Sequence, residues 1–313
     1  MNLPLVNWHS VTTQPCELGE SPFWHPLEKM LYWVDIPGKK ILRSRGTAGT
    51  PESWLMQAPH ALEPGCIAPA RQGGLVIALR DGIYRAPAWG GALQTLVPFA
   101  HDAKSTRFND GKCDPCGRFW AGTVYEPRDA PKAALFSVDC RQGGLPLVEL
   151  KADDAITANG LAWSADRKTV YWSDTPRHII RAWDWDEASN VMSAARVFHQ
   201  FSAKPDGWHY GMAGYGGRPD GAAVDVQGNY FVAMYEGRRL LKLSPAGDIL
   251  ADIPTPTQCP TMPCFGDDDL KTLYLTTARH QRSAAELADM PLSGCVFSMR
   301  VEVPGLPVNF FID

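Results

Sequence analysis

The stretch RPDGAAVDVQGNYFVAMY, residues 218–235, indicates how this chain folds. Apolar and polar residues alternate along it on both sides of a break at Gln227, Gly228 and Asn229. Strict alternation is typical of half-buried β-strands, and a short Gly-containing break between two such runs predicts a tight turn. The stretch is therefore predicted to be a β-hairpin, with the acidic residue Asp220 at the head of its first strand.

The same pattern recurs five more times, each time with a head residue before the first strand and a Gly- or Asp-containing turn in the middle. The six heads are Glu20, Glu63, Asn109, Asn159, Asp220 and a position near Thr261. Strand–turn–strand modules repeating every ~40–60 residues are typical of propeller blades. Long helical periodicity is not evident, and 28 Gly and 26 Pro punctuate the chain. We predict an all-β fold, a six-bladed β-propeller that spans residues 1–313 as one domain, with four strands in each blade.

Composition narrows the classes of partner. The 313 residues are 45% hydrophobic and 20% charged, as expected for a globular protein. A formal charge of −4 without a basic tract argues against nucleic acid as a partner. The amino terminus lacks a signal-peptide pattern, and no apolar run reaches the roughly 20 residues of a spanning helix, so we expect no membrane association and a cytoplasmic location. Eight scattered cysteines are expected to be mostly reduced and buried. Nothing in the sequence indicates an oligomeric state.

The heads carry the expected chemistry. If each head begins the innermost strand of its blade, Glu20, Asn109, Asn159 and Asp220 meet at one end of the central channel. Carboxylates brought close together resist ionisation, and a bound divalent cation removes that conflict. Carboxylate and amide oxygens favour a hard ion, with Ca²⁺ first, Mg²⁺ or Mn²⁺ next, and Zn²⁺ compatible through carboxylates.

Four sequence blocks carry a resemblance to a known family. They are GESPFW (19–24), RFNDGKCDPCGRFWAGT (107–123), NGLAWSAD (159–166), and PDGAAVD followed by GNYFVAMYEG (within 219–237). These blocks resemble those of the SMP-30/gluconolactonase/luciferin-regenerating-enzyme family, also called regucalcin-like proteins, from about residue 16 to residue 300. The resemblance implies a six-bladed propeller with one divalent metal ion in its channel and, in many members, hydrolysis of sugar lactones.

The resemblance also implies site residues. The Glu of GESP, the Asn of NGL and the Asp of PDG correspond to metal ligands, which here are Glu20, Asn159 and Asp220. Substrate contacts are implied for Arg107 and Asn109, with Asn109 also near the metal. Glu126 is the nearest candidate for a further acidic substrate contact.

The function that follows is metal-dependent opening of a sugar lactone to the aldonic acid, with the cation polarising the carbonyl. Asp220 would be ligand and general base together, or would orient the attacking water. Arg107 would hold ring hydroxyls or developing charge. Two alternatives stay open: hydrolysis of other lactones or phosphotriesters in the same site, and a calcium-binding propeller without turnover. Which lactone is bound is left open too.

Other polar residues receive structural interpretations. Glu20, Asn159 and Asp220 could merely cap strands and turns. Asp110 and Lys112 are interpreted as turn and surface residues. The remaining structural predictions concern Cys113 and Cys116 as parts of a hairpin turn, Asp206 as a loop residue, and the Trp residues at 24, 33, 120, 163 and 172 as core.

The segment 202–218 is too irregular for a strand and is predicted to be a surface loop near one mouth of the channel. Its aromatic residues Trp208, His209 and Tyr210 could cover a sugar pocket.

Overall fold

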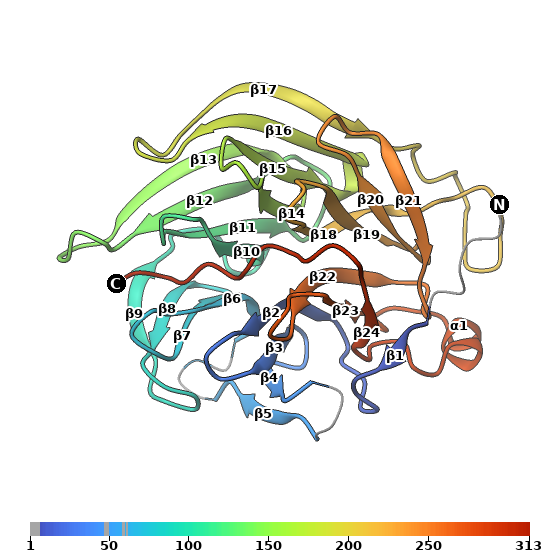
Figure 1. Ribbon diagram of the computed structural model, residues 1–313, viewed down its shortest axis with the longest axis horizontal. Coiled ribbons are helices and arrows are strands. Elements are labelled where there is room, and N and C mark those ends of the chain that lie inside the picture. Colours follow the sequence, from blue (N-terminus) through green and yellow to red (C-terminus); the bar gives the residue numbers. More distant parts are fainter. Residues whose placement is uncertain (1–6, 47–49, 58–59, 61) are drawn as a thin grey trace.

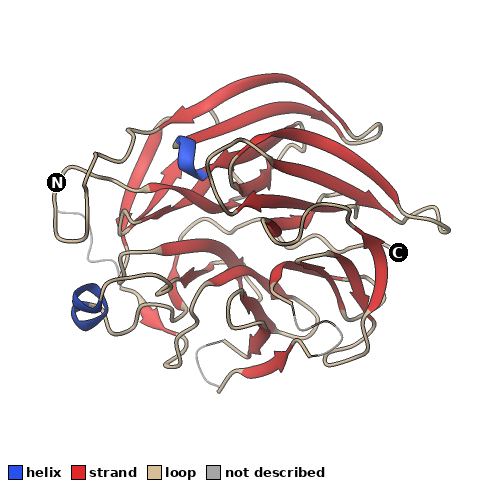
Figure 2. Cartoon of the chain, turned by 180° about the vertical axis from the view of Figure 1, so that it is seen from behind, coloured by secondary structure: helices blue, strands red, loops and turns tan. Residues whose placement is uncertain are grey.

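Six antiparallel four-stranded sheets surround a central channel (Figure 1). The computed structural model describes residues 7–46, 50–57, 60 and 62–313. Nearly all regular structure is β, and only two short helical turns, α1 (Ala284–Asp289) and η1 (Thr175–Arg177), accompany the strands in the described residues. Figure 2 shows how strands dominate the chain. The predicted six-bladed β-propeller is confirmed.

Five blades are continuous in sequence and have strand order one to four from the channel outward. Blade 1 contains β2 (Gly19–His25), β3 (Met30–Asp35), β4 (Lys40–Ser44) and β5 (Glu52–Leu55). Blade 2 contains β6 (Pro64–Pro69), β7 (Leu75–Leu79), β8 (Gly82–Ala86) and β9 (Gln94–Pro98). Blade 3 contains β10 (Thr106–Cys113), β11 (Phe119–Tyr125), β12 (Ala133–Asp139) and β13 (Leu147–Ala155). Blade 4 contains β14 (Ala158–Trp163), β15 (Thr169–Asp174), β16 (Ile179–Asp186) and β17 (Val191–Gln200). Blade 5 contains β18 (Arg218–Val224), β19 (Tyr230–Tyr235), β20 (Arg239–Leu243) and β21 (Ile249–Pro254).

The sixth blade is assembled from both ends of the chain. It contains β22 (Pro260–Gly266), β23 (Thr272–Thr277), β24 (Phe297–Arg300) and the amino-terminal strand β1 (His9–Ser10). His9 pairs with Ser298 and Ser10 with Phe297, so the amino terminus supplies the outermost strand of the last sheet. This pairing joins the first and last segments of the ring without a covalent bond.

The opening hairpin is β18 and β19, and its turn is held by a buried aspartate. Asp225 is fully buried and its Oδ1 accepts hydrogen bonds from the backbone N–H groups of Gln227 and Asn229, each at 2.9 Å. Asp114 does the same in blade 3, where its Oδ1 accepts from the N–H groups of Cys116 and Arg118. Such Asx turns reverse the chain in a short loop, which is why these turns were visible in the sequence.

Each inner strand carries a bulge at its head or directly after it. In all six blades the register between the first and second strands shifts by an extra residue, for example between Glu20 and Phe23 and between Pro219 and Ala222. A β-bulge re-aims the side chains beside it. Gly160 occupies one bulge with φ +61°, and a Cβ there would lie 2.5 Å from the Tyr230 hydroxyl, so that only glycine fits. The bulges therefore let inner strands approach closely at the channel.

The core fills the spaces between blades. The five Trp residues predicted to be core are each at most 6% exposed. Trp120 makes an edge-to-face contact with Trp163 at 5.3 Å between ring centroids, which joins blade 3 to blade 4.

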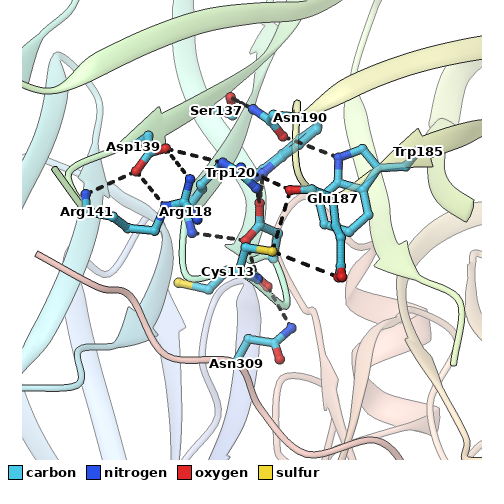
Figure 3. Close-up of polar contacts among 12 residues, drawn as sticks. Cys113, Arg118, Trp120, Ser137, Asp139, Arg141, Trp185, Glu187, Asn190 and Asn309 are labelled. Carbon is cyan, nitrogen blue, oxygen red and sulfur yellow. Dashed lines mark hydrogen bonds and ion pairs between the residues drawn. The ribbon is translucent and has the colours of Figure 1, made fainter. Parts of the chain in front are cut away.

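The segment with Cys113 and Cys116 belongs to a polar network between blades 3 and 4 (Figure 3). Arg118 donates to the backbone carbonyl of Glu187 at 3.1 Å, and the Cys116 thiol lies 3.6 Å from the same oxygen. Asn309 donates to the carbonyl of Cys113 at 3.1 Å. All eight cysteines are free thiols and six are buried. These contacts favour the structural interpretation of the pair.

The carboxyl-terminal tail, residues 303–313, crosses the face of the ring that is toward the viewer in Figure 1, where it is the red segment leading to the C label. Its Leu306 N–H donates to the carbonyl of Val224 in blade 5, and its Phe311 N–H donates to that of Pro69 in blade 2. Residues 306–309 also line a cavity of about 220 Å³ at this end of the channel. The tail therefore links distant blades.

We expect Phe311→Ala to destabilise the protein by ~3–5 kcal/mol, since the ring is fully buried and its loss leaves a cavity. Urea denaturation would measure the loss. Leu145→Ala, which removes a side chain that is 95% exposed, is the control and should change the free energy of unfolding by less than ~0.5 kcal/mol. Equal, small effects in both variants would contradict a structural role for the tail.

No helix in the described part of the chain is long and apolar enough to span a membrane.

Candidate active site

A cavity of about 560 Å³ lies at the end of the channel where the inner strands begin, opposite the carboxyl-terminal tail. All six blades contribute to its wall. The four heads predicted to meet there, Glu20, Asn109, Asn159 and Asp220, all line it. The predicted convergence of these side chains is therefore present in the structure.

Two carboxyl groups form the buried part of this cavity. Glu20 on β2 is 6% exposed and Asp220 on β18 is 5% exposed. Burial, and then the nearby charges of Asp220 and Asp110, raise the pKa of Glu20 well above its ordinary value. Burial, and then Asp110, likewise raise the pKa of Asp220. The cation-free site therefore holds negative charge unfavourably.

The two carboxylates suit a hard divalent cation. Glu20 accepts a hydrogen bond from the backbone N–H of Ser21 at 3.3 Å. Among the described residues, neither Glu20 nor Asp220 has a cationic side chain within ion-pair distance. Oxygen donors with unneutralised charge, next to the amide of Asn159, are the ligand set that Ca²⁺ and similar ions prefer. The residues present thus fit a divalent cation.

A chain of hydrogen bonds fixes the two amides of the site. Asn109 Nδ2 donates to Asn159 Oδ1 at 2.8 Å, and Asn159 Nδ2 donates to the Thr175 hydroxyl at 2.7 Å. That hydroxyl donates in turn to the carbonyl of Pro219, one residue before Asp220. Both amides are buried and linked across blades 3, 4 and 5. Their side chains are therefore preorganised rather than free to rotate.

Arg107 borders the cavity beside Asn109. Its Nη1 donates to Asn109 Oδ1 at 2.8 Å and to the carbonyl of Phe108 at 2.9 Å. Glu126 lies at the mouth, where Arg80 contacts both of its oxygens and Arg107 Nε lies 3.4 Å away. The pKa of Glu126 is lowered, because these hydrogen bonds and charges outweigh its desolvation. All three predicted substrate residues, Arg107, Asn109 and Glu126, thus line the cavity, with the carboxylate of Glu126 held by arginines.

A second charged cluster forms the opposite rim. Glu236, only 4% exposed, contacts Lys204, Arg218 and Arg282 at 3.0, 3.3 and 2.9 Å. Lys204 belongs to the long loop between β17 and β18, so this cluster ties the loop to the rim.

The loop prediction is correct in part. Residues 201–217 form an irregular segment, and Asp206 is an exposed loop residue. Trp208, however, is buried against Tyr215, with ring centroids 5.0 Å apart, and none of Trp208, His209 and Tyr210 lines the cavity. These three residues therefore do not roof the cavity in this structure.

The interpretation of Asp110 and Lys112 as turn and surface residues is wrong. Both lie on the inner strand β10, and Asp110 is 4% exposed. Asp110 Oδ2 accepts from the backbone N–H of Leu161 at 2.9 Å, and Lys112 Nζ donates to the carbonyl of Ala222 in blade 5 at 2.7 Å. The bulge between Phe108 and Gly111 adds the residue that turns this part of the strand inward. Asp110 is thus a buried group of the inner strand, and Lys112 is a half-buried one that lines the cavity at the tail end of the channel.

Comparison with known proteins agrees with this geometry. The family model described as SMP-30/Gluconolactonase/LRE-like region matches residues 18–279. This chain belongs to that family. The resemblance seen in the four sequence blocks is therefore confirmed, and the chain shares the six-bladed architecture of solved family structures.

Several family relatives match over nearly the whole chain. A protein of Pseudomonas putida named 6-deoxy-6-sulfogluconolactonase is 43% identical over 96% of this chain and 97% of its own length. A regucalcin of Danio rerio is 33% identical over 93% of both chains. Among solved structures, a calcium-binding protein, regucalcin, of Agrobacterium tumefaciens is 21% identical and superposes with a TM-score of 0.86 over 98% of this chain and 97% of its own.

Proposed function

We propose that this family member is a hydrolase that opens a sugar lactone to its aldonic acid and uses one divalent cation, Ca²⁺ first, in the central channel. The observation that carries the proposal is the pair of buried carboxylates, Glu20 and Asp220, next to Asn159 at the base of the cavity. Relatives named as lactonases support the reaction, and a solved neighbour named as calcium-binding supports the cation.

Glu20, Asn159 and Asp220 would hold the cation, because they offer oxygen donors from three blades. Mg²⁺, Mn²⁺ or Zn²⁺ would also be compatible with these donors. When bound, the cation supplies Lewis-acid polarisation of the lactone carbonyl and stabilises negative charge on its oxygen.

The residues of the chain would handle the substrate and the proton. Asn109 and Arg107, held by their mutual hydrogen bond, would position the lactone ring and its hydroxyls. A water molecule adds to the carbonyl carbon, and Asp220 accepts its proton. The bond from that carbon to the ring oxygen then breaks, and the ring oxygen takes the proton back from Asp220 to become the hydroxyl of the aldonic acid. Glu126 would contribute at the mouth through Arg107 and Arg80.

A panel of freshly prepared lactones, followed by acid release, tests the reaction class. We expect hydrolysis of aldonolactones, with the 6-deoxy-6-sulfo derivative of gluconolactone included because of the Pseudomonas putida relative. Aliphatic lactones and a phosphotriester complete the panel. Hydrolysis of the phosphotriester in preference to every sugar lactone would contradict the proposal, and cation binding without any hydrolysis would favour a binding protein instead. A cytoplasmic location stays a prediction from the sequence.

A further inference from the structure

Positively charged side chains on the cavity wall would outnumber the negatively charged ones once a divalent cation is bound. Five arginines and five acidic residues line the cavity. The arginines are Arg80, Arg107, Arg128, Arg218 and Arg282, and the acidic residues are Glu20, Glu63, Glu126, Asp220 and Glu236. If Glu20 and Asp220 are neutralised by a divalent cation, three carboxylates remain to balance five guanidinium groups. The loaded cavity would then carry surplus positive charge.

The surplus lies in identifiable places. Arg80 pairs with Glu63 and Glu126, and Arg107 lies beside Glu126, so this side of the wall is balanced. On the other side, Glu236 is shared by Arg218, Arg282 and Lys204. Arg282 has a second partner in Glu286, which is fully buried behind it. On this side, three cationic side chains thus face only two carboxylates, those of Glu236 and Glu286. Glu236 is the ion-pair partner of Arg218, and two other cations share it.

Arg128 is the wall arginine that has no ion pair among the described residues. It follows β11 in the turn to β12, with φ 58°, and its backbone N–H donates to the carbonyl of Tyr125 at 3.0 Å. Its side chain is exposed at the cavity, and no ion pair joins it to any carboxylate of the described residues. Arg128 and Arg218 line the same cavity as Glu20 and Asp220, so a ligand bound there can meet both guanidinium groups.

Arg218 also has unused donor capacity. Its Nε is buried and makes no hydrogen bond in the described structure, while its guanidinium carbon lies 5.3 Å from the centre of the Tyr235 ring. A buried donor without a partner is costly, so Arg218 retains donor capacity that its protein neighbours do not satisfy.

We propose that Arg128, assisted by Arg218, binds an oxyanion group that the substrate carries at the end remote from its lactone carbonyl, and so makes the site selective for acidic sugar lactones. This inference rests on the proposed lactone hydrolysis. Arginine suits the role because its planar guanidinium donates several hydrogen bonds to sulfonate, phosphate or carboxylate oxygens. Selectivity follows because a neutral lactone leaves the surplus charge of the wall unpaired.

The test compares neutral and acidic lactones on the same variants. The neutral substrate is gluconolactone, and the acidic substrates carry a sulfonate or a phosphate at carbon six. Arg128→Gln is expected to lower the acidic-to-neutral ratio of kcat/KM by ~10- to 100-fold, mainly through KM, because one charge-assisted interaction is lost. Arg128→Lys should recover part of that ratio. The control Arg167→Gln removes an exposed arginine beside the cavity at the other end of the channel and should leave the ratio unchanged.

Outcomes separate this inference from the proposed function. A wild-type preference for the neutral lactone, or an equal loss on both substrates in Arg128→Gln, would overturn the inference while the lactonase proposal stands. If no lactone is hydrolysed, the proposed function fails, and calorimetry with the sulfonated aldonate then tests the oxyanion site by itself. Binding to wild type that is at least about tenfold weaker in Arg128→Gln would support the site, and unchanged binding would overturn it. The sulfonate and phosphate arms show which oxyanion is preferred.

Discussion

Replacement of Asp220 by Asn is expected to lower kcat/KM for the preferred sugar lactone by about 10³-fold or more. The substitution keeps the size of the side chain but removes a cation ligand and the proposed proton acceptor together. Asp220 is 5% exposed and lines the cavity together with Glu20, and among the described residues neither carboxylate has an ion-pair partner. Steady-state kinetics on the purified variant would measure the loss.

The chain offers a matched control for this variant. A second Pro-Asp-Gly occurs at residues 205–207, and its Asp206 is exposed in the loop between β17 and β18. Asp206→Asn should retain wild-type kinetics. Asp220→Asn should also fold normally, since it relieves repulsion with Asp110 in the cation-free protein. Wild-type activity in Asp220→Asn would contradict the role of Asp220 as cation ligand and proton acceptor. If the variant loses its activity because it does not fold, the result no longer supports that role.

Exhaustive removal of divalent cations should lower the rate of lactone hydrolysis about as much as Asp220→Asn does. Adding Ca²⁺ back should restore the rate. Cation binding should also raise the midpoint of thermal unfolding, because the ion binds the folded site and not the dispersed ligands. Chelation followed by titration of Ca²⁺, Mg²⁺, Mn²⁺ and Zn²⁺ would measure both effects. Hydrolysis at the full rate after chelation would contradict cation dependence.

The pH dependence of this stabilisation has a defined sign. The pKa values of Glu20 and Asp220 are raised in the cation-free fold, so these groups keep their protons above the ordinary carboxyl range near ~4. Their charging therefore lowers the stability of the cation-free protein as the pH rises through that window. Protons and cations compete for the same oxygens, so the Ca²⁺-induced shift in Tm should be small at about pH 5 and larger at about pH 8. A larger shift at the acidic pH would contradict this coupling.

The sequence was sufficient for the ring and for the convergence of its heads. The alternation around Asp220 predicts a hairpin directly. The repetition of that pattern predicts the blades, because each propeller blade contains the same strand–turn–strand module. Head residues at equivalent blade positions must face the same end of the channel. Glu20, Asn109, Asn159 and Asp220 therefore line one cavity, as expected.

The structure differs from the sequence-based prediction where the pairing register of a strand is locally irregular. Asp110 and Lys112 follow Asn109 in a segment rich in residues typical of turns, and the sequence analysis interprets them as turn and surface residues. The bulge before Gly111 instead places both on the inner strand, with Asp110 buried. The dipeptide Asn159-Gly160, in which Asn159 is the head, marks such a bulge, since Gly160 adopts a positive φ. This signal was present in the sequence but resembled an ordinary turn.

Long-range contacts of the ends were beyond sequence patterns. Pairing of His9 with Ser298 joins residues far apart in the chain, and the tail reaches Pro69 through Phe311. Neither contact follows from local alternation, because both depend on closure of the whole ring. The same holds for the pairing of Arg80 with Glu126, whose partner choice depends on how adjacent blades are placed.

Anomalous diffraction from crystals grown with Mn²⁺ would test the central claim most directly, because the scattering locates the ion independently of activity. The account predicts one strong peak at the base of the 560 Å³ cavity, within coordination distance of oxygens of Glu20, Asn159 and Asp220. A peak at another place, or a cavity without a peak while these side chains point away from it, would contradict the account.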